Sequence, residues 1–103
     1  MKRVRSLLRH LRDDDPPLLE VRVSFRGTVQ GDSACTVARD REGKPLRFVI
    51  RERNAEPRLM ELELCRQWAH ALEWRDDGCD GVTHDAAWQN TFGRLCAAHI
   101  YGL

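Results

Sequence analysis

Apolar and polar residues alternate most regularly between Leu18 and Gln30, where a period of two runs through the whole segment. Its apolar positions are Leu19, Val21, Val23, Phe25, Gly27 and Val29. Successive side chains of a strand point to opposite faces of its sheet. The segment is therefore predicted to be a strand with one face against a core and the other in water.

Two more strands are predicted after it. Gly31 and Asp32 favour a tight turn, so residues 33–39 are expected to return antiparallel to the first strand. A longer turn then leads to residues 46–53, which alternate again with Leu46, Phe48 and Ile50 facing the core. The three strands are thus predicted to form an antiparallel meander, with the second strand between the first and the third.

The remaining segments are predicted to be helical. Apolar residues spaced as i, i+3, i+4 and i+7 indicate an amphipathic helix over residues 2–12. Asn54 is placed to cap a second helix, whose apolar body covers residues 59–74. Aromatic and aliphatic residues at helical spacing predict a last helix over residues 84–100.

These elements predict an α+β domain, with an N-terminal helix, a three-stranded antiparallel meander and two C-terminal helices packed on one face of the sheet. A chain of 103 residues is long enough for one core, so residues 1–103 are expected to form a single domain. The expected core consists of Phe25, Phe48, Ile50, Leu64, Trp68, Trp88, Phe92 and Leu95.

The order of helix, three strands and helix resembles the topology of the double-stranded-RNA-binding domain, which reads RNA shape across minor grooves. That family begins its last helix with a lysine-rich patch that contacts phosphates. Here the matching segment, residues 54–58, reads Asn-Ala-Glu-Pro-Arg and continues with Glu61 and Glu63. The segment is acidic where the family is basic, and the chain matches no family motif.

Charge is distributed unevenly along the chain, although the net charge is only +1. Residues 1–53 hold 13 basic and 8 acidic residues, and residues 54–103 hold 4 and 8, which gives +5 and −4. Of the 17 basic residues, 15 are Arg. A GC-rich genome favours Arg without selection for function, and the alternative is selection for its planar, bidentate guanidinium.

The charged residues predict two candidate docking sides. Alternation places arginines on the outer face of the sheet, at Arg22, Arg26, Arg47, Arg51 and Arg53. Whether they converge depends on strand order, because a meander separates the first strand from the third. The candidate acidic side is made of Glu63, Asp76 and Asp77.

Metal and catalytic sites are not expected. Cys79, His84, Cys96 and His99 have the residue types of a zinc site, but a helix over residues 84–99 would separate the two histidines by roughly 22 Å. Acidic neighbours raise the pKa of a thiol at Cys79, whereas nucleophilic catalysis needs it lowered. The sequence contains no Gly-rich phosphate loop, GxSxG or HExxH motif. We therefore expect no cofactor, no metal and no enzymatic activity.

The favoured interpretation is a small binding module that docks onto a macromolecular partner, most simply a protein complex. Small size and arginine bias are compatible with an inhibitor or adaptor from a phage or mobile element, for example an anti-CRISPR-like inhibitor of a host defence complex. The alternative is a nucleic-acid-binding domain that uses the arginine-rich sheet face with Arg3 and Arg5 of the first helix. Isolated cysteines and the lack of a signal peptide or membrane span predict a cytoplasmic protein. It is expected to be a monomer or a homodimer, and a third interpretation is a structural homodimer sealed by the third helix.

Overall fold

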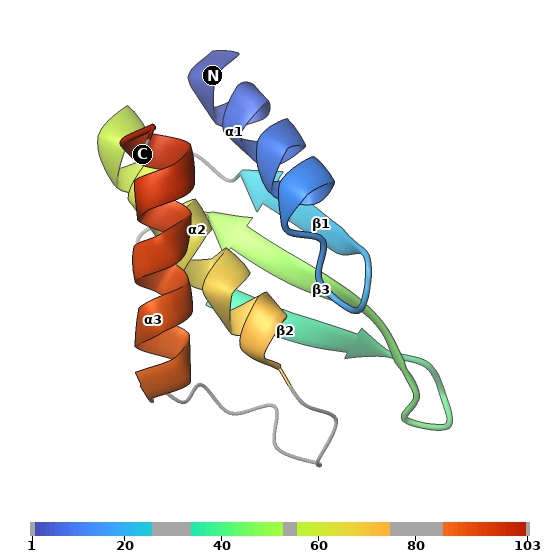
Figure 1. Ribbon diagram of the computed structural model, residues 1–103. Coiled ribbons are helices and arrows are strands. Elements are labelled where there is room, and N and C mark those ends of the chain that lie inside the picture. Colours follow the sequence, from blue (N-terminus) through green and yellow to red (C-terminus); the bar gives the residue numbers. More distant parts are fainter. Residues whose placement is uncertain (1, 26–33, 53–55, 75–85, 103) are drawn as a thin grey trace.

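The computed structural model describes residues 2–25, 34–52, 56–74 and 86–102. The elements are α1 (Lys2–Asp14), β1 (Val21–Phe25), β2 (Ala34–Arg39), β3 (Pro45–Glu52), α2 (Pro57–Glu73), α3 (Ala86–Leu95) and a π-helical turn, η1 (Cys96–Ile100) (Figure 1). The predicted α+β class is confirmed. Within the described ranges, no helix is both long enough and apolar enough to cross a membrane.

The amphipathic pattern of α1 decides how this helix packs. Its i, i+3, i+4 and i+7 positions, Val4, Leu7, Leu8 and Leu11, are all buried. The helix ends where the Asp15 N–H donates to the carbonyl of Leu11 at 2.9 Å, just before two prolines that disfavour further helical geometry. The predicted first helix is therefore confirmed, with its basic residues on the outside.

The sheet is mixed, so the predicted antiparallel meander is wrong. The strand order is β1-β3-β2, with β1 parallel to β3 and β2 antiparallel to β3. Val21 lies opposite Phe48 in the parallel pair, and Cys35 lies opposite Ile50 in the antiparallel pair. The third strand, and not the second, is therefore central.

The turn between β2 and β3 explains which half of the predicted meander forms. Asp40 accepts hydrogen bonds at Oδ1 from the N–H groups of Glu42 and Lys44, and its own N–H donates to the carbonyl of Lys44. Gly43 adopts a φ of 85°, which glycine tolerates without steric cost. This local chemistry fixes the β2–β3 hairpin. The predicted turn at residues 30–33 lies outside the described residues, and β1 pairs along the other edge of β3.

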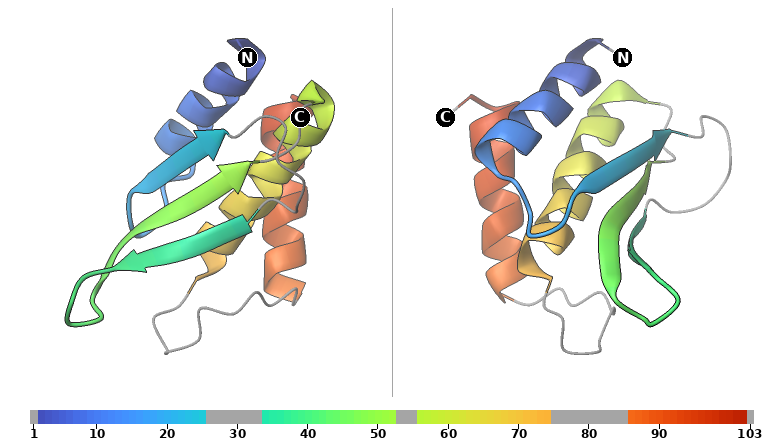
Figure 2. Two further views of the ribbon diagram at one scale, coloured as in Figure 1. Left: turned by 180° about the vertical axis from the view of Figure 1, so that it is seen from behind. Right: turned by 90° about the vertical axis from the view of Figure 1, so that its right-hand side faces the viewer.

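The helices lie on one side of the sheet and leave the other side open. Two views of the ribbon show α1, α2 and α3 on the same side of the three strands (Figure 2). α2 lies against β2 and β3, α3 packs on α2, and α1 packs on α2 and on η1, the turn that continues α3. The face of the sheet away from the helices has no covering element among the residues that the structure describes.

The core lies between the sheet and α2. Six of the eight residues expected there are buried, and Phe25 and Phe92 are half-buried against them. Along β3, Phe48 and Ile50 face the core as predicted, but Leu46 is 45% exposed. Leu46 follows directly after the turn, where β3 extends beyond the helices, and the next inward position after Ile50 is the buried Glu52.

The N-cap of the second helix lies two residues after the expected cap. Glu56 is its N-cap, and its Oε2 accepts a hydrogen bond from the N–H of Leu59 at 2.8 Å. Pro57 occupies the first turn, where a missing N–H donor costs nothing. Asn54 itself lies outside the described residues, as do residues 84 and 85, the first two of the predicted last helix.

Candidate functional site

The strand order brings arginines from two strands together on the open face of the sheet. Arg22 of β1 lies opposite Val49 of β3, so it is flanked diagonally by Arg47 and Arg51, which share that face. Diagonal neighbours on adjacent strands lie within reach of long side chains. We call the side-chain set Arg22, Arg47 and Arg51 the arginine face. A meander would have placed β2 between these residues.

Most of the charge on the arginine face is uncompensated. Arg47 Nε lies 3.7 Å from Glu20 Oε1 at the surface, in a pair whose side chains are 34% and 68% exposed. Such exposed pairs contribute little to stability and are easily exchanged for another carboxylate. Arg22 and Arg51 are exposed, and within the described ranges neither forms an ion pair. The face therefore attracts acidic groups.

The rest of the open face is small and uncharged. β2 contributes Ala34, Thr36 and Ala38, which lie opposite Arg51, Val49 and Arg47 of β3. The aromatic residues of the described strands, Phe25 and Phe48, belong to the side that packs on the helices. On the described strands, the arginine face thus offers cationic groups beside small uncharged side chains, and no aromatic ring for stacking.

The remaining predicted contact residues do not join this face within the described structure. Glu63 lies on α2, where its Oε1 is 3.4 Å from Arg66 Nη1. Arg26, Arg53, Asp76 and Asp77 lie outside the described residues. Among the described residues, the predicted contact residues that come together are therefore those of the arginine face.

Acidic residues of α2 are occupied by contacts within the chain. Glu56 caps the helix, and Glu61 Oε1 lies 3.1 Å from Arg3 Nε. Glu63 pairs with Arg66, and Glu73 accepts a hydrogen bond from the hydroxyl of Thr91 on α3. These carboxylates stabilise the helical layer and are less available to a partner than Arg22 and Arg51.

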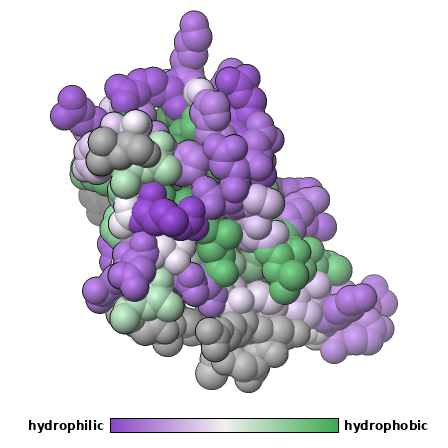
Figure 3. All heavy atoms as spheres, in the orientation of Figure 1, coloured by the Kyte–Doolittle hydropathy of each residue, from purple (hydrophilic) through white to green (hydrophobic). Residues whose placement is uncertain are grey.

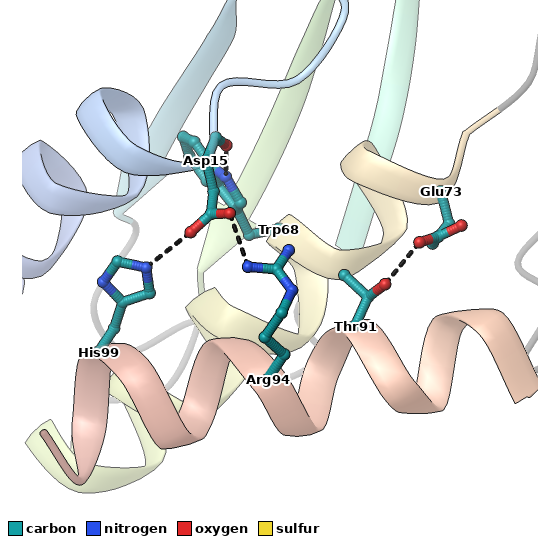
Figure 4. A network of polar contacts seen from close by, with 6 residues as sticks. All are labelled: Asp15, Trp68, Glu73, Thr91, Arg94 and His99. Atoms are coloured by element: carbon teal, nitrogen blue, oxygen red, sulfur yellow. Dashed lines mark hydrogen bonds and ion pairs between the residues drawn. The ribbon is translucent and has the colours of Figure 1, made fainter. Parts of the chain in front are cut away.

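A polar network around Asp15 was not expected from the sequence. The Asp15 carboxylate lies 2.8 Å from Arg94 Nη1 and 2.9 Å from His99 Nε2, and its backbone carbonyl accepts a hydrogen bond from Trp68 Nε1 at 2.8 Å (Figure 4). Burial raises the pKa of this carboxyl, but the hydrogen bonds from His99 and Arg94 outweigh burial and hold the pKa below its ordinary value. The network joins the end of α1 to α2, α3 and η1.

A second unexpected cluster lies between α2 and α3. The rings of His70 and Trp88 stack with centroids 4.9 Å apart, and the Arg66 guanidinium lies 5.7 Å from the Trp88 ring centroid. Arg66 and His70 are four residues apart, a spacing that places two side chains on the same face of a helix. This spacing is the sequence feature that could have indicated the cluster. This cluster explains how a short helix such as α3 is held on α2.

The thiols and histidines do not assemble into a reactive site in the described ranges. Burial raises the pKa of Cys35 and of Cys65 to about 12, and it also raises the pKa of Cys96. His99 faces Asp15, and no cluster of three or more metal-ligating side chains occurs among the described residues.

No protein-family model, curated protein or solved structure matches the chain.

The raised thiol pKa values predict slow alkylation of the folded protein. In a Cys79→Ser background, Cys35 and Cys65 should react with a thiol reagent at pH 8 about a thousandfold more slowly than in guanidinium, because a pKa near 12 depletes the thiolate by that factor. Mass spectrometry of quenched samples measures the rates. Equal rates in the folded and unfolded protein would contradict the burial of these thiols.

Proposed function

We propose that this protein is a non-enzymatic binding module that docks onto an acidic surface of a partner protein through the arginine face. The partner is a macromolecular complex that the module inhibits or to which it acts as an adaptor, in the manner of phage and mobile-element proteins such as anti-CRISPR inhibitors. The observation that carries the proposal is the convergence of Arg22, Arg47 and Arg51 on the sheet face that no described element covers (Figure 2).

The charges favour the sheet side over the helix side as the contact surface. Arg22 and Arg51 are exposed, and neither forms an ion pair within the described ranges, whereas Glu61, Glu63 and Glu73 are engaged by neighbouring side chains. Removing an engaged carboxylate from its partner costs free energy that an unengaged arginine does not lose on binding. An acidic partner therefore gains most by approaching the arginine face, where guanidinium groups can bind carboxylates with two hydrogen bonds.

The shape and composition of the same face favour protein over nucleic acid. Single-stranded nucleic acids are held on open sheets mainly by stacking of bases on aromatic side chains. On the described strands the aromatic residues face the helices, and the open face presents Thr36, Val49 and alanines beside the arginines. Nucleic-acid binding, in which Arg3 and Arg5 of α1 would assist, is the alternative function.

Charge reversal on the arginine face is expected to weaken partner binding. The protein serves as bait in a lysate of its host, with and without nuclease, and Arg22→Glu/Arg51→Glu is compared with Arg5→Glu/Arg9→Glu, which makes the same charge change on exposed residues of α1. We expect a partner that survives nuclease, is retained by the α1 variant and is weakened at least about tenfold by the sheet variant, chiefly through slower association.

Two outcomes would contradict this proposal. A partner captured equally by the sheet variant would exclude the arginine face as the contact surface. Submicromolar binding of the free protein to generic duplex or single-stranded nucleic acid at about 150 mM salt would favour the alternative, because nonspecific binding there is typically about 10⁻⁴ to 10⁻⁶ M. In that case each arginine replaced should flatten the dependence of log affinity on log salt by about one unit.

A further inference from the structure

The outer edge of β1 presents unpaired backbone groups. In a parallel pair, alternate residues of each strand bond to the partner strand. Phe48 donates its N–H to the carbonyl of Glu20, and with Val21 opposite Phe48 this places the backbone groups of Arg22 and Ser24 toward β3. The N–H and C=O groups of Val21, Val23 and Phe25 therefore point away from the sheet.

Only one of these outward groups is occupied within the described structure. Arg12 Nη2 donates to the carbonyl of Val21 at 3.3 Å. The N–H and the carbonyl of Val23 have no hydrogen-bond partner among residues 2–25, 34–52, 56–74 and 86–102. Every Cα–Cα distance between α1 and β1 exceeds 8 Å, so the backbone of α1 does not pair with this edge.

An apolar groove continues this edge at the start of β1. It has a volume of about 380 Å³ and is lined by Arg12, residues 16–20, Val21 and Trp68. Leu18, at its rim, is 83% exposed. In the space-filling view, hydrophobic residues gather on this side of the molecule near the segment between α1 and β1, with hydrophilic surface around them (Figure 3).

The two sides of the β1 edge differ in chemistry. A strand added beside β1 would point alternate side chains to the arginine face, next to Arg22, and the others to the helix side, next to the groove and the half-buried Val23. Arg12 adds a further guanidinium at the groove. The other edge strand, β2, presents only Ala34, Thr36 and Ala38 on the open side, so it offers no such charge pattern.

We propose that the free edge of β1 binds an extended segment of the partner protein in which acidic residues alternate with apolar ones. The backbone of that segment pairs with Val23 and Phe25, its carboxylates contact the arginine face, and one apolar side chain enters the groove. This is strand addition to a sheet edge, in which main-chain hydrogen bonds supply affinity and alternate side chains supply specificity. The inference rests on the proposed function and names the form of its partner.

Hydrogen exchange of the wild-type protein tests this directly. The probe is a synthetic peptide of about ten residues that alternates Glu and Val, a length typical of strands. At saturating peptide, exchange of the Val23 and Phe25 amides should slow at least about tenfold, whereas the amides of Arg22 and Ser24, which already face β3, should change little. Unchanged exchange at Val23 would overturn the proposal.

Matched peptides and variants separate strand addition from charge attraction. A peptide with its glutamates in one block and its valines in another has the same charge and should bind at least about tenfold more weakly. Val23→Pro removes the edge N–H without removing a hydrogen bond to β3, so it should weaken binding of the alternating peptide at least about tenfold. Val23→Thr keeps that N–H and should change the affinity for this peptide less than about twofold. If Val23→Pro does not fold, the wild-type exchange data decide the question.

The experiment also distinguishes this inference from the proposed function. Equal binding of the two peptides, together with loss of partner capture on charge reversal of the arginine face, would overturn strand addition and leave the proposed function standing. Partner capture that is unchanged by charge reversal of the arginine face would overturn the proposed function itself. A homodimer in sedimentation, dissociated by Val23→Pro, would assign the edge to a second copy of the chain and overturn the proposal.

Discussion

Phe48→Ala is expected to lower the free energy of unfolding by about 3–5 kcal/mol, a large share of the roughly 5–15 kcal/mol that stabilises an ordinary domain. Phe48 is 1% exposed, lies on the central strand and packs edge-to-face on Trp74, with ring centroids 5.4 Å apart. Its truncation removes contacts with both neighbouring strands and with the helical layer. Chemical denaturation followed by circular dichroism measures the loss.

Leu46→Ala is the matched control, because Leu46 lies on the same strand two residues before Phe48 but is 45% exposed. Its truncation should cost less than about 1 kcal/mol, since most of the lost surface already meets water. Similar costs at the two positions would show that β3 is not buried as described. A Phe48→Ala protein that keeps its melting temperature within a few degrees would contradict the central position of β3.

Asp15→Asn is expected to cost about 2 kcal/mol at neutral pH. The substitution keeps the shape of the side chain but removes the charge that holds Arg94 and His99, and hydrogen bonds to charged groups contribute about 1.5–3 kcal/mol each before solvent screening. The pair with Arg94 is discounted because that side chain is 54% exposed, whereas His99 is only 5% exposed. Asp14→Asn, at an exposed neighbouring position, is the control and should change stability by less than about 0.5 kcal/mol.

The pH dependence of stability identifies Asp15 as the cause. Because the pKa of this carboxyl is lower in the folded protein, its contribution is present above the unfolded-state value of about 3.9 and is lost as pH falls through the folded-state value. Wild type and Asp15→Asn should therefore differ in stability at neutral pH and converge as pH falls through the folded-state pKa of Asp15, which lies below the ordinary carboxyl value. A difference that persists unchanged into acid would assign the effect to packing instead of charge.

The sheet order also changes what the charged residues can do. Parallel pairing of β1 with β3 turns arginines that would have been separated in a meander into neighbours. The same pairing leaves β1 as an edge strand, whose outward backbone groups adjoin those arginines. The arginine face and the proposed peptide edge therefore have one structural origin.

Sequence alone determined the elements whose signals are local. The i, i+3, i+4 and i+7 apolar residues of α1, the alternation of Phe48 and Ile50, and the turn before β3 each depend on residues close together in the sequence. The placement of Arg22, Arg47 and Arg51 on the outer side of their strands followed from the same alternation. These features do not depend on how the elements pack together, because the period of a strand or helix alone determines which of its side chains share a face.

Only the tertiary structure decided which of these faces meet. An alternating strand can pair with either edge of a hairpin, and the position of β1 beside β3 depends on burial of Val21 against a core that distant segments supply. The pairing of Asp15 with His99, 84 residues away in the chain, is likewise invisible to a local pattern. Contacts between remote segments are selected by the free energy of the whole packed domain, so the convergence of the arginines and the free edge of β1 emerged only from the fold.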